Sequence, residues 1–187
     1  MSKPSALQVV IINGRPGCGK TTFENFCQDI LGEPFCQKRS TVDKVKEIAR
    51  EGGWKGGKEL RDREFLSDLK DLFTDYNDMP LNDICHFLKG WEQELEMYGV
   101  QNLHHILFVD DREPEHIERL KKKLEGMGIQ VFTLLIRRPG DEYMEVSNHA
   151  DANVFEYEYD YTVFNSRDLE HFRKTAKEVV TLLSEKI

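Results

Sequence analysis

The sequence predicts an α/β fold in which a mostly parallel sheet is covered by helices on both faces. Apolar, β-branched segments alternate with segments of helical periodicity, and the first apolar segment runs into a glycine-rich turn followed by a helix. In such folds, ligands bind at the carboxyl ends of the strands. Strands are expected at residues 7–12, 35–40, 105–109, 130–136 and 161–164.

Helices are expected between these strands. The first places Phe23, Phe26, Cys27 and Ile30 on one face and is ended by Gly32. Others are expected at residues 114–125 and 168–184. Residues 41–99 keep helical spacing without a strand and predict a helical insert. The glycine-rich stretch 52–57 within it fits a plain linker better than a mobile element that closes over substrate.

The composition indicates one folded, soluble domain. The chain has 187 residues, 39% of them hydrophobic, with a net charge of −8 and a pI near 5.3. It lacks the broad basic field of a nucleic-acid binder, and no apolar stretch predicts a signal peptide or membrane span. The four cysteines form no CxxC pair, so reduced thiols in a cytoplasmic protein are expected.

The strongest motif is the glycine-rich turn at residues 14–21. Gly-Arg-Pro-Gly-Cys-Gly-Lys-Thr matches GxxxxGK[ST] at every fixed position and stands between a predicted strand and a predicted helix. In such a loop the backbone N–H groups face the phosphates of ATP, Lys20 reaches the β- and γ-phosphates, and Thr21 ligates Mg²⁺. The nucleotide-binding candidates are Gly14, Arg15, Pro16, Gly17, Cys18, Gly19, Lys20, Thr21 and Thr22.

An aspartate ends the apolar segment at residues 105–109. Asp110 is the Walker B candidate, which would hold Mg²⁺ opposite Thr21. Asp111 should point elsewhere by strand alternation and is expected to be solvated or to cap a helix. Arg112 lies at the same sheet edge, where its guanidinium would pair with a phosphate or form a surface salt bridge.

Two further cations end the next strand. Arg137 and Arg138 precede Pro139-Gly140 and lie on the same rim, where phosphoryl transfer needs positive charge. One of the two is expected to serve the transfer. The histidines lack any spacing typical of a zinc site.

The motifs together resemble the nucleoside monophosphate kinase-like P-loop proteins, in particular the phage-type deoxynucleoside monophosphate kinases. The resemblance spans most of the chain. It is most specific at residues 108–112, Phe-Val-Asp-Asp-Arg, which look like that family's strand ending in Asp-x-Arg. The segment Arg-Arg-Pro-Gly at 137–140 follows as in the family, and His149-Ala150-Asp151 and residues 160–165 look like its short lid and last strand.

The resemblance implies a P-loop NTPase fold with a five-stranded sheet. Its core would comprise residues 6–40 and 103–187, with a helical acceptor-binding insert at about 41–100 and a lid at about 138–158. Arg112 would bind the acceptor phosphate, and Arg137 or Arg138 would lie near the transferred phosphate. Arg39 and Ser40 look like the start of a monophosphate-binding segment. Residues 61–68 depart from the family by lacking its Gln-x-Gly-Thr signature, and Arg63 within them is kept as an acceptor candidate.

These observations favour Mg²⁺-dependent transfer of the γ-phosphoryl group of ATP to a nucleoside or deoxynucleoside monophosphate. Two alternatives stay open at this point. One is a kinase of another small metabolite on the same fold; the other is a non-enzymatic nucleotide-binding switch protein. The sequence predicts a small-molecule acceptor as partner, not nucleic acid or a membrane.

Overall fold

Five strands form one parallel sheet in the order β2-β3-β1-β4-β5. The computed structural model describes residues 6–57, 59–143 and 153–187. The strands are β1 (Leu7–Asn13), β2 (Cys36–Ser40), β3 (His105–Asp110), β4 (Gln130–Arg137) and β5 (Tyr161–Phe164). Every expected strand is present within two residues of its predicted ends, and the predicted α/β class with a parallel sheet is confirmed.

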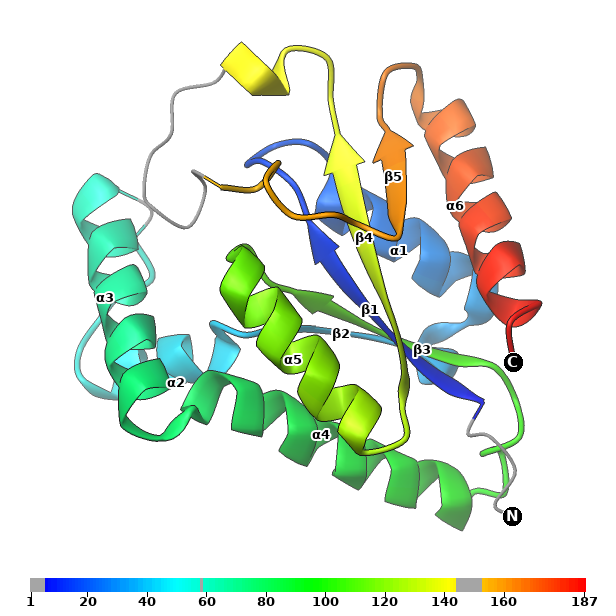
Figure 1. The fold of residues 1–187 in the computed structure, drawn as a ribbon, viewed down its shortest axis with the longest axis horizontal. Helices are drawn as coiled ribbons and strands as arrows, with labels where there is room; N and C mark the ends of the chain where they lie inside the picture. The colour runs from blue at the N-terminus through cyan, green and yellow to red at the C-terminus, as the bar shows by residue number, and fades with distance from the viewer. Residues whose placement is uncertain (1–5, 58, 144–152) are drawn as a thin grey trace.

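Helices cover both faces of the sheet (Figure 1). On one face lie α1 (Lys20–Leu31) and α6 (Leu169–Ser184), and on the other lie α4 (Met79–Met97) and α5 (Pro114–Gly126). Alternate residues of each strand therefore enter two separate cores: Val10 and Ile12 pack with Phe23 and Phe172, whereas Ile11 packs against α4 and α5. Burial on both faces explains why the strands are apolar throughout rather than alternating.

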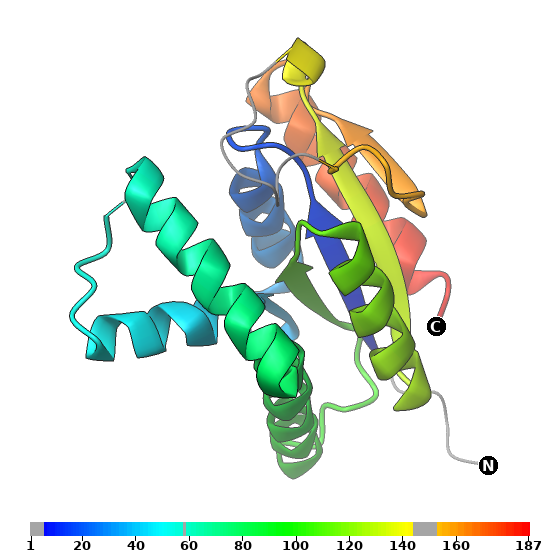
Figure 2. The ribbon, with the colours of Figure 1, turned by 60° about the vertical axis from the view of Figure 1, so that its left-hand side comes forward.

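Two helices stand apart from the sheet. They are α2 (Asp43–Glu51) and α3 (Leu60–Asn77), which share a small core containing Val45, Ala49 and Leu66 (Figure 2). The glycine-rich linker joins them and is fastened to α3, because Trp54 Nε1 donates to Asp62 Oδ1 at 2.8 Å. By contrast, α4 lies within the range expected for the insert but packs directly on the sheet.

Two short 3-10 helices complete the described elements, η1 (Glu33–Phe35) and η2 (Asp141–Tyr143). In the part of the chain that the structure describes, no helix combines the length and the apolar character needed to cross a membrane.

His105 begins β3 and is fully buried between aromatic rings. Its ring centroid lies 5.3 Å from that of Phe35 and 5.8 Å from that of Trp91. Burial lowers the pKa of His105 below its ordinary value of 6.5. The folded chain therefore resists a proton that the unfolded chain accepts as the pH falls through that value.

We expect this histidine to make the free energy of unfolding fall as the pH is lowered from 7.5 to 5.5. Because the pKa of His105 is lower in the folded chain, its neutral ring costs no stability above the unfolded pKa of 6.5. Below that pH the unfolded chain gains a proton that the folded chain does not, and the free energy of unfolding falls. Between these two pH values, the free energy of unfolding of His105→Phe should fall by about 1 kcal/mol less than that of the wild type. Urea unfolding at the two pH values measures the difference, and an equal loss in both proteins would contradict the explanation.

Candidate active site

The glycine-rich loop connects β1 to α1, and the side chain of Lys20 folds back onto the loop backbone. Lys20 Nζ donates to the carbonyl oxygen of Gly14 at 2.6 Å and to that of Arg15 at 3.4 Å. The backbone at Gly14, Gly17 and Gly19 has φ of 146°, 77° and 108°. These values belong to the region that favours glycine, so the loop can turn its N–H groups inward as a phosphate cradle requires.

Two of these glycines are also required by close packing. A Cβ at Gly14 would stand 2.4 Å from the carbonyl oxygen of Ile136, and one at Gly19 would stand 2.6 Å from Asn165 Nδ2. The loop therefore packs closely against the carboxyl ends of β4 and β5. Pro16 and Gly17 lie at its tip, while Cys18 is fully buried beneath it, as expected for a space-filling residue.

Neighbouring segments hold the loop in place. Asn165 Nδ2 donates to the carbonyl oxygen of Cys18 at 3.0 Å, and Asn165 N donates to that of Arg137 at 2.7 Å. Asn13, at the end of β1, accepts from Gly14 N at 2.7 Å and donates to the hydroxyl of Tyr159 at 2.7 Å. Neither asparagine was singled out in the sequence, because Asn13 reaches Tyr159 and Asn165 reaches Cys18, contacts between residues more than a hundred positions apart in the chain.

Asp110 ends β3 beside the loop. The register pairs Asp110 with Ile12 of β1 and with Ser40 of β2. Burial raises the pKa of Asp110, while the positive charge of Lys20 opposes that rise. The sequence-predicted Walker B carboxylate therefore lies within the field of the Walker A lysine, and both are at the carboxyl edge of the sheet.

A second carboxyl group, missed in the sequence, meets Asp110. Glu24 of α1 is 3% exposed, and burial, followed by the charge of Asp110, raises the pKa of Glu24 to about 8. A side-chain hydrogen bond between the two carboxyl groups adds to this rise. A signal was available: Glu24 follows Lys20 by four residues and precedes Cys27 by three, which puts a charged residue on the buried side of the helix.

These oxygen ligands fit Mg²⁺. Thr21 is the second residue of α1, directly after Lys20, and the Oε1 atom of Glu24 has no hydrogen-bond partner among the described residues. No group of three His, Cys, Asp or Glu side chains in the described ranges could hold a metal by itself. The cation would thus depend on nucleotide phosphates and water for most of its ligands, as Mg²⁺ at phosphate sites usually does.

The expectation for Asp111 was wrong in one respect. Asp111 is 2% exposed rather than solvated, and it caps no helix, since Glu113 takes the N-cap position of α5. Its Oδ1 accepts from Lys70 Nζ of α3 at 3.2 Å and from Arg112 N at 2.9 Å. Lys70 also pairs with Glu113 at 3.1 Å. Asp111 thus ties α3 to the end of β3.

Arg112 has its backbone held on both sides. Besides the bond from Arg112 N to Asp111, the carbonyl oxygen of Arg112 accepts from Asn13 Nδ2 at 3.0 Å. The residue follows β3 directly and is partly buried. The backbone of Arg112 is therefore fixed between the glycine-rich loop and α3, and its side chain extends from there.

Two arginines near the loop, Arg15 and Arg137, lie over the ring of Phe155. The guanidinium carbon of Arg15 lies 5.3 Å from the Phe155 ring centroid, and that of Arg137 lies 4.7 Å from it. Arg138 reaches the loop itself, with Nη1 donating to the carbonyl oxygen of Gly17 at 3.5 Å. Arg15, Arg137 and Arg138 thus concentrate positive charge around the loop. Phe155, which the sequence gave no reason to select, orients two of them.

The proposed acceptor residues are more widely spread. Arg39 lies over the Phe87 ring of α4 at 3.9 Å, and Ser40 Oγ is 3.5 Å from the carbonyl oxygen of Asp110. Arg63 is exposed near the first turn of α3, and Thr22 follows Thr21 in α1. Figure 1 shows α3 on the side toward which the strands point. The central part of the expected lid, residues 144–152 with His149-Ala150-Asp151, lies outside the described residues.

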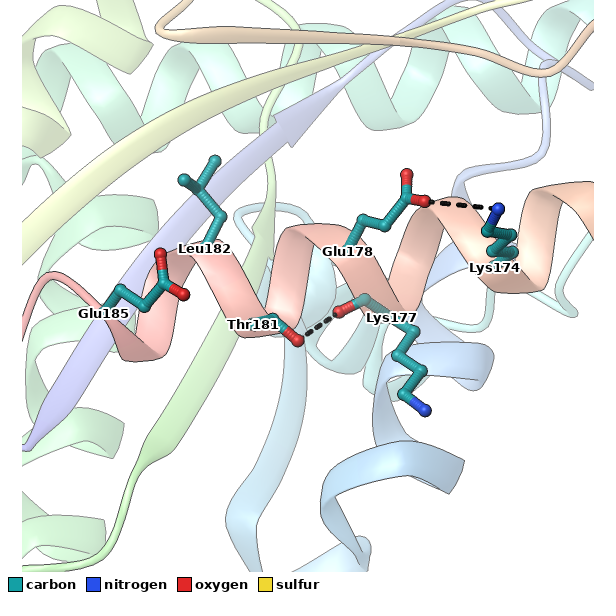
Figure 3. A pocket seen from close by; sticks show the side chains of 6 residues that line it. All are labelled: Lys174, Lys177, Glu178, Thr181, Leu182 and Glu185. Carbon is teal, nitrogen blue, oxygen red and sulfur yellow. Dashed lines mark hydrogen bonds and ion pairs between the residues drawn. The ribbon is translucent and has the colours of Figure 1, made fainter.

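The hollow drawn in Figure 3 is unrelated to these groups. It measures about 530 Å³ and lies on the outer face of α6. Its lining consists of Lys174, Lys177, Glu178, Thr181, Leu182 and Glu185, all of them exposed. None of the sequence-predicted site residues contributes to it.

Comparison with known proteins shows the fold. No protein-family model and no curated protein matches the chain. A solved structure of a putative kinase from Chloroflexus aurantiacus aligns with a TM-score of 0.55 at 12% identity, covering 96% of this chain and 99% of that one. The APS kinase of Mycobacterium tuberculosis in complex with AMPPNP and APS aligns with a TM-score of 0.52 at 18% identity, covering 97% and 99%. The chain therefore shares the α/β fold of these two solved kinases.

Proposed function

We propose that this protein is an ATP- and Mg²⁺-dependent kinase that phosphorylates a nucleoside or deoxynucleoside monophosphate. One observation carries the proposal: a complete Walker A loop, the partly buried Asp110 and several arginines meet at the carboxyl edge of one parallel sheet. This is the edge where α/β proteins bind ligands. The similar APS kinase was solved with AMPPNP and APS, so a nucleotide donor and a small acceptor are accommodated by this fold.

The residues divide the work of phosphoryl transfer. The loop N–H groups and Lys20 would bind the β- and γ-phosphates, and Thr21 and Asp110 would hold Mg²⁺. Mg²⁺, when bound, bridges phosphate oxygens and neutralises charge on the transferring group. Arg137 or Arg138 would add positive charge there, and Arg112 would hold the acceptor phosphate. Because little covalent chemistry is needed, alignment and charge supply the catalysis.

The insert supplies the other side of the acceptor site in this proposal. Lys70 binds α3 to Asp111, directly before Arg112, so α3 is joined to the segment that carries Arg112. Arg63 near the start of α3 and Ser40 at the end of β2 are the further acceptor candidates. The four cysteines are buried and unbridged, and a location in the cytoplasm is part of this proposal.

The direct test measures ADP formation from MgATP with a panel of acceptors. The panel contains ribo- and deoxyribonucleoside monophosphates, APS, phosphorylated sugars and a sample without acceptor. Stimulation by one or more nucleoside monophosphates is expected. Stimulation by another metabolite alone would redirect the proposal to that substrate class, and ATP binding without stimulation by any acceptor would favour a nucleotide switch.

Arg112→Lys should weaken binding of the acceptor more than binding of ATP. Lysine keeps the charge but loses the planar fork that binds phosphate with two hydrogen bonds. A charge-assisted contact is worth about 1.5 to 3 kcal/mol, so the acceptor KM should rise about 10- to 100-fold. Calorimetry with MgATP should show little change, because the backbone of Arg112 is held by Asn13 and Asp111 whatever the side chain.

Arg119→Lys is the matched control for this substitution. Arg119 lies on α5 and pairs with Asp78 at 2.8 Å, away from the loop, so both affinities should stay unchanged. If Arg112→Lys instead weakens ATP and spares the acceptor, Arg112 belongs to the donor site.

A further inference from the structure

Glu24 is a buried acid that the fold alone does not explain. It is 3% exposed within α1, whose other buried side chains are the apolar Phe23 and Cys27. Its Oε1 atom has no hydrogen-bond partner among the described residues. A buried carboxyl group without full hydrogen bonding costs stability unless another charge or a ligand compensates it.

The cations near Glu24 do not provide that compensation through a direct bond. Lys20 Nζ donates to two loop carbonyl groups, and Lys38 Nζ donates to Asn25 Oδ1 at 2.7 Å. In the described part of the chain, neither lysine forms an ion pair with Glu24. The side chain that does contact Glu24 is another acid, Asp110, through a hydrogen bond between the two carboxyl groups, and Oε1 of Glu24 still has no partner among the described residues.

The position of Glu24 relates it to the nucleotide. It lies three residues after Thr21 and four after Lys20 on the same helix, so Glu24 is a neighbour of each of them on the helix surface. Asp110 approaches from β3. The two carboxyl groups thus meet one helical turn after the threonine that the proposed function assigns to the cation.

We propose that Glu24 is a second carboxylate of the divalent-cation site, accepting hydrogen bonds from water molecules that the cation keeps beside Asp110. This inference rests on the proposed function and adds a positioning residue to it. Mg²⁺ dehydrates reluctantly and keeps several waters, which need acceptors of this kind. A hydrated cation beside Asp110 attracts both carboxylates, and one of its waters gives the unpartnered Oε1 oxygen a hydrogen-bond donor.

The test compares how strongly a cation improves nucleotide binding in the wild type and in Glu24→Gln. Calorimetry measures the Kd of AMPPNP once in EDTA and once with saturating Mn²⁺, and the ratio of the two values is the contribution of the cation. Loss of an outer ligand typically weakens metal binding about 10- to 100-fold. The ratio should therefore fall at least about tenfold in Glu24→Gln, while the Kd in EDTA stays within about twofold.

Two controls make the result specific. Asp29→Asn removes an exposed acid of the same helix, one that pairs with Arg173 at 3.5 Å, and should leave the ratio unchanged. The EPR spectrum of bound Mn²⁺ in the AMPPNP complex should change in Glu24→Gln but not in Asp29→Asn. If Glu24→Gln does not fold, Glu24→Asp, which retains the charge but is shorter by one methylene group, should show the same fall in the ratio.

An unchanged ratio in folded Glu24→Gln would overturn the inference alone, since nucleotide and cation would still bind. A wild type that binds no AMPPNP in either buffer would overturn the proposed function and the inference with it. A Kd in EDTA that rises as much as the Kd with Mn²⁺ would assign Glu24 to the shape of the loop and not to the cation.

Discussion

Lys20→Ala is expected to reduce phosphoryl transfer about 100- to 1,000-fold and to leave the fold intact. In the proposed function this lysine carries its charge to the β- and γ-phosphates, and loss of a single preorganised group at a transition state typically costs about 100- to 1,000-fold. The side chain packs against no core cluster; it donates to the carbonyl oxygens of Gly14 and Arg15. Losing these bonds should lower Tm by only about 2–4 °C.

The measurement is kcat with MgATP and the preferred acceptor, with Tm read in the absence of ligand. Lys122→Ala is the control, because Lys122 is 73% exposed on α5 and pairs only with Glu118 among the described residues. Its kcat should equal that of the wild type. Turnover of Lys20→Ala near the wild-type value would refute the assignment of residues 14–21 as the phosphate-binding loop.

The architecture could be predicted because each strand and helix carries its own periodic signal. Val9, Val10 and Ile11 are apolar in succession because helices bury both faces of β1, a pattern typical of parallel sheets. The glycine-rich loop was equally clear, since phosphate binding by backbone groups demands fixed glycines between a strand and a helix.

The contacts between side chains of distant elements could not be predicted in the same way. Strand alternation correctly indicated that Asp110 and Asp111 differ in direction, but it could not show that Lys70 of α3 would meet Asp111. That bond depends on how the α2–α3 unit docks on the sheet. Without knowledge of this bond, a second aspartate at the end of a strand is expected to face solvent.

Glu24 and Phe155 illustrate two further limits. Glu24 lies in a helix that was predicted from its apolar residues. The role of this glutamate becomes apparent only from its contact with Asp110 in the folded chain. Phe155 follows residues 144–152 and gathers Arg15 and Arg137, which lie more than a hundred residues apart in the chain. Arg39 likewise meets Phe87 through the packing of α4 on the edge of the sheet.

The two adjacent aspartates should respond differently to the same substitution because their surroundings differ. Asp110 faces Lys20 and Glu24, and burial already disfavours its charge. Asp111 is fixed by Lys70, whose amino group would remain buried beside Glu113 alone if Asp111 lost its charge. Breaking one partner of a buried pair is strongly destabilising, whereas removing a carboxylate that is already costly to bury is not.

Asp110→Asn should therefore reduce Mg²⁺-dependent kcat about 100-fold or more without lowering Tm, because the amide keeps the shape but loses the charge that holds the cation. Asp111→Asn should lower Tm by several degrees and retain most of the kcat per folded molecule. Steady-state assays over a range of Mg²⁺ concentrations, corrected for the folded fraction, separate the two effects, and Asp29→Asn serves as the exposed control. An equal loss of kcat in folded Asp110→Asn and Asp111→Asn, or a larger loss at Asp111, would show that the cation does not bind on the Asp110 side of the strand.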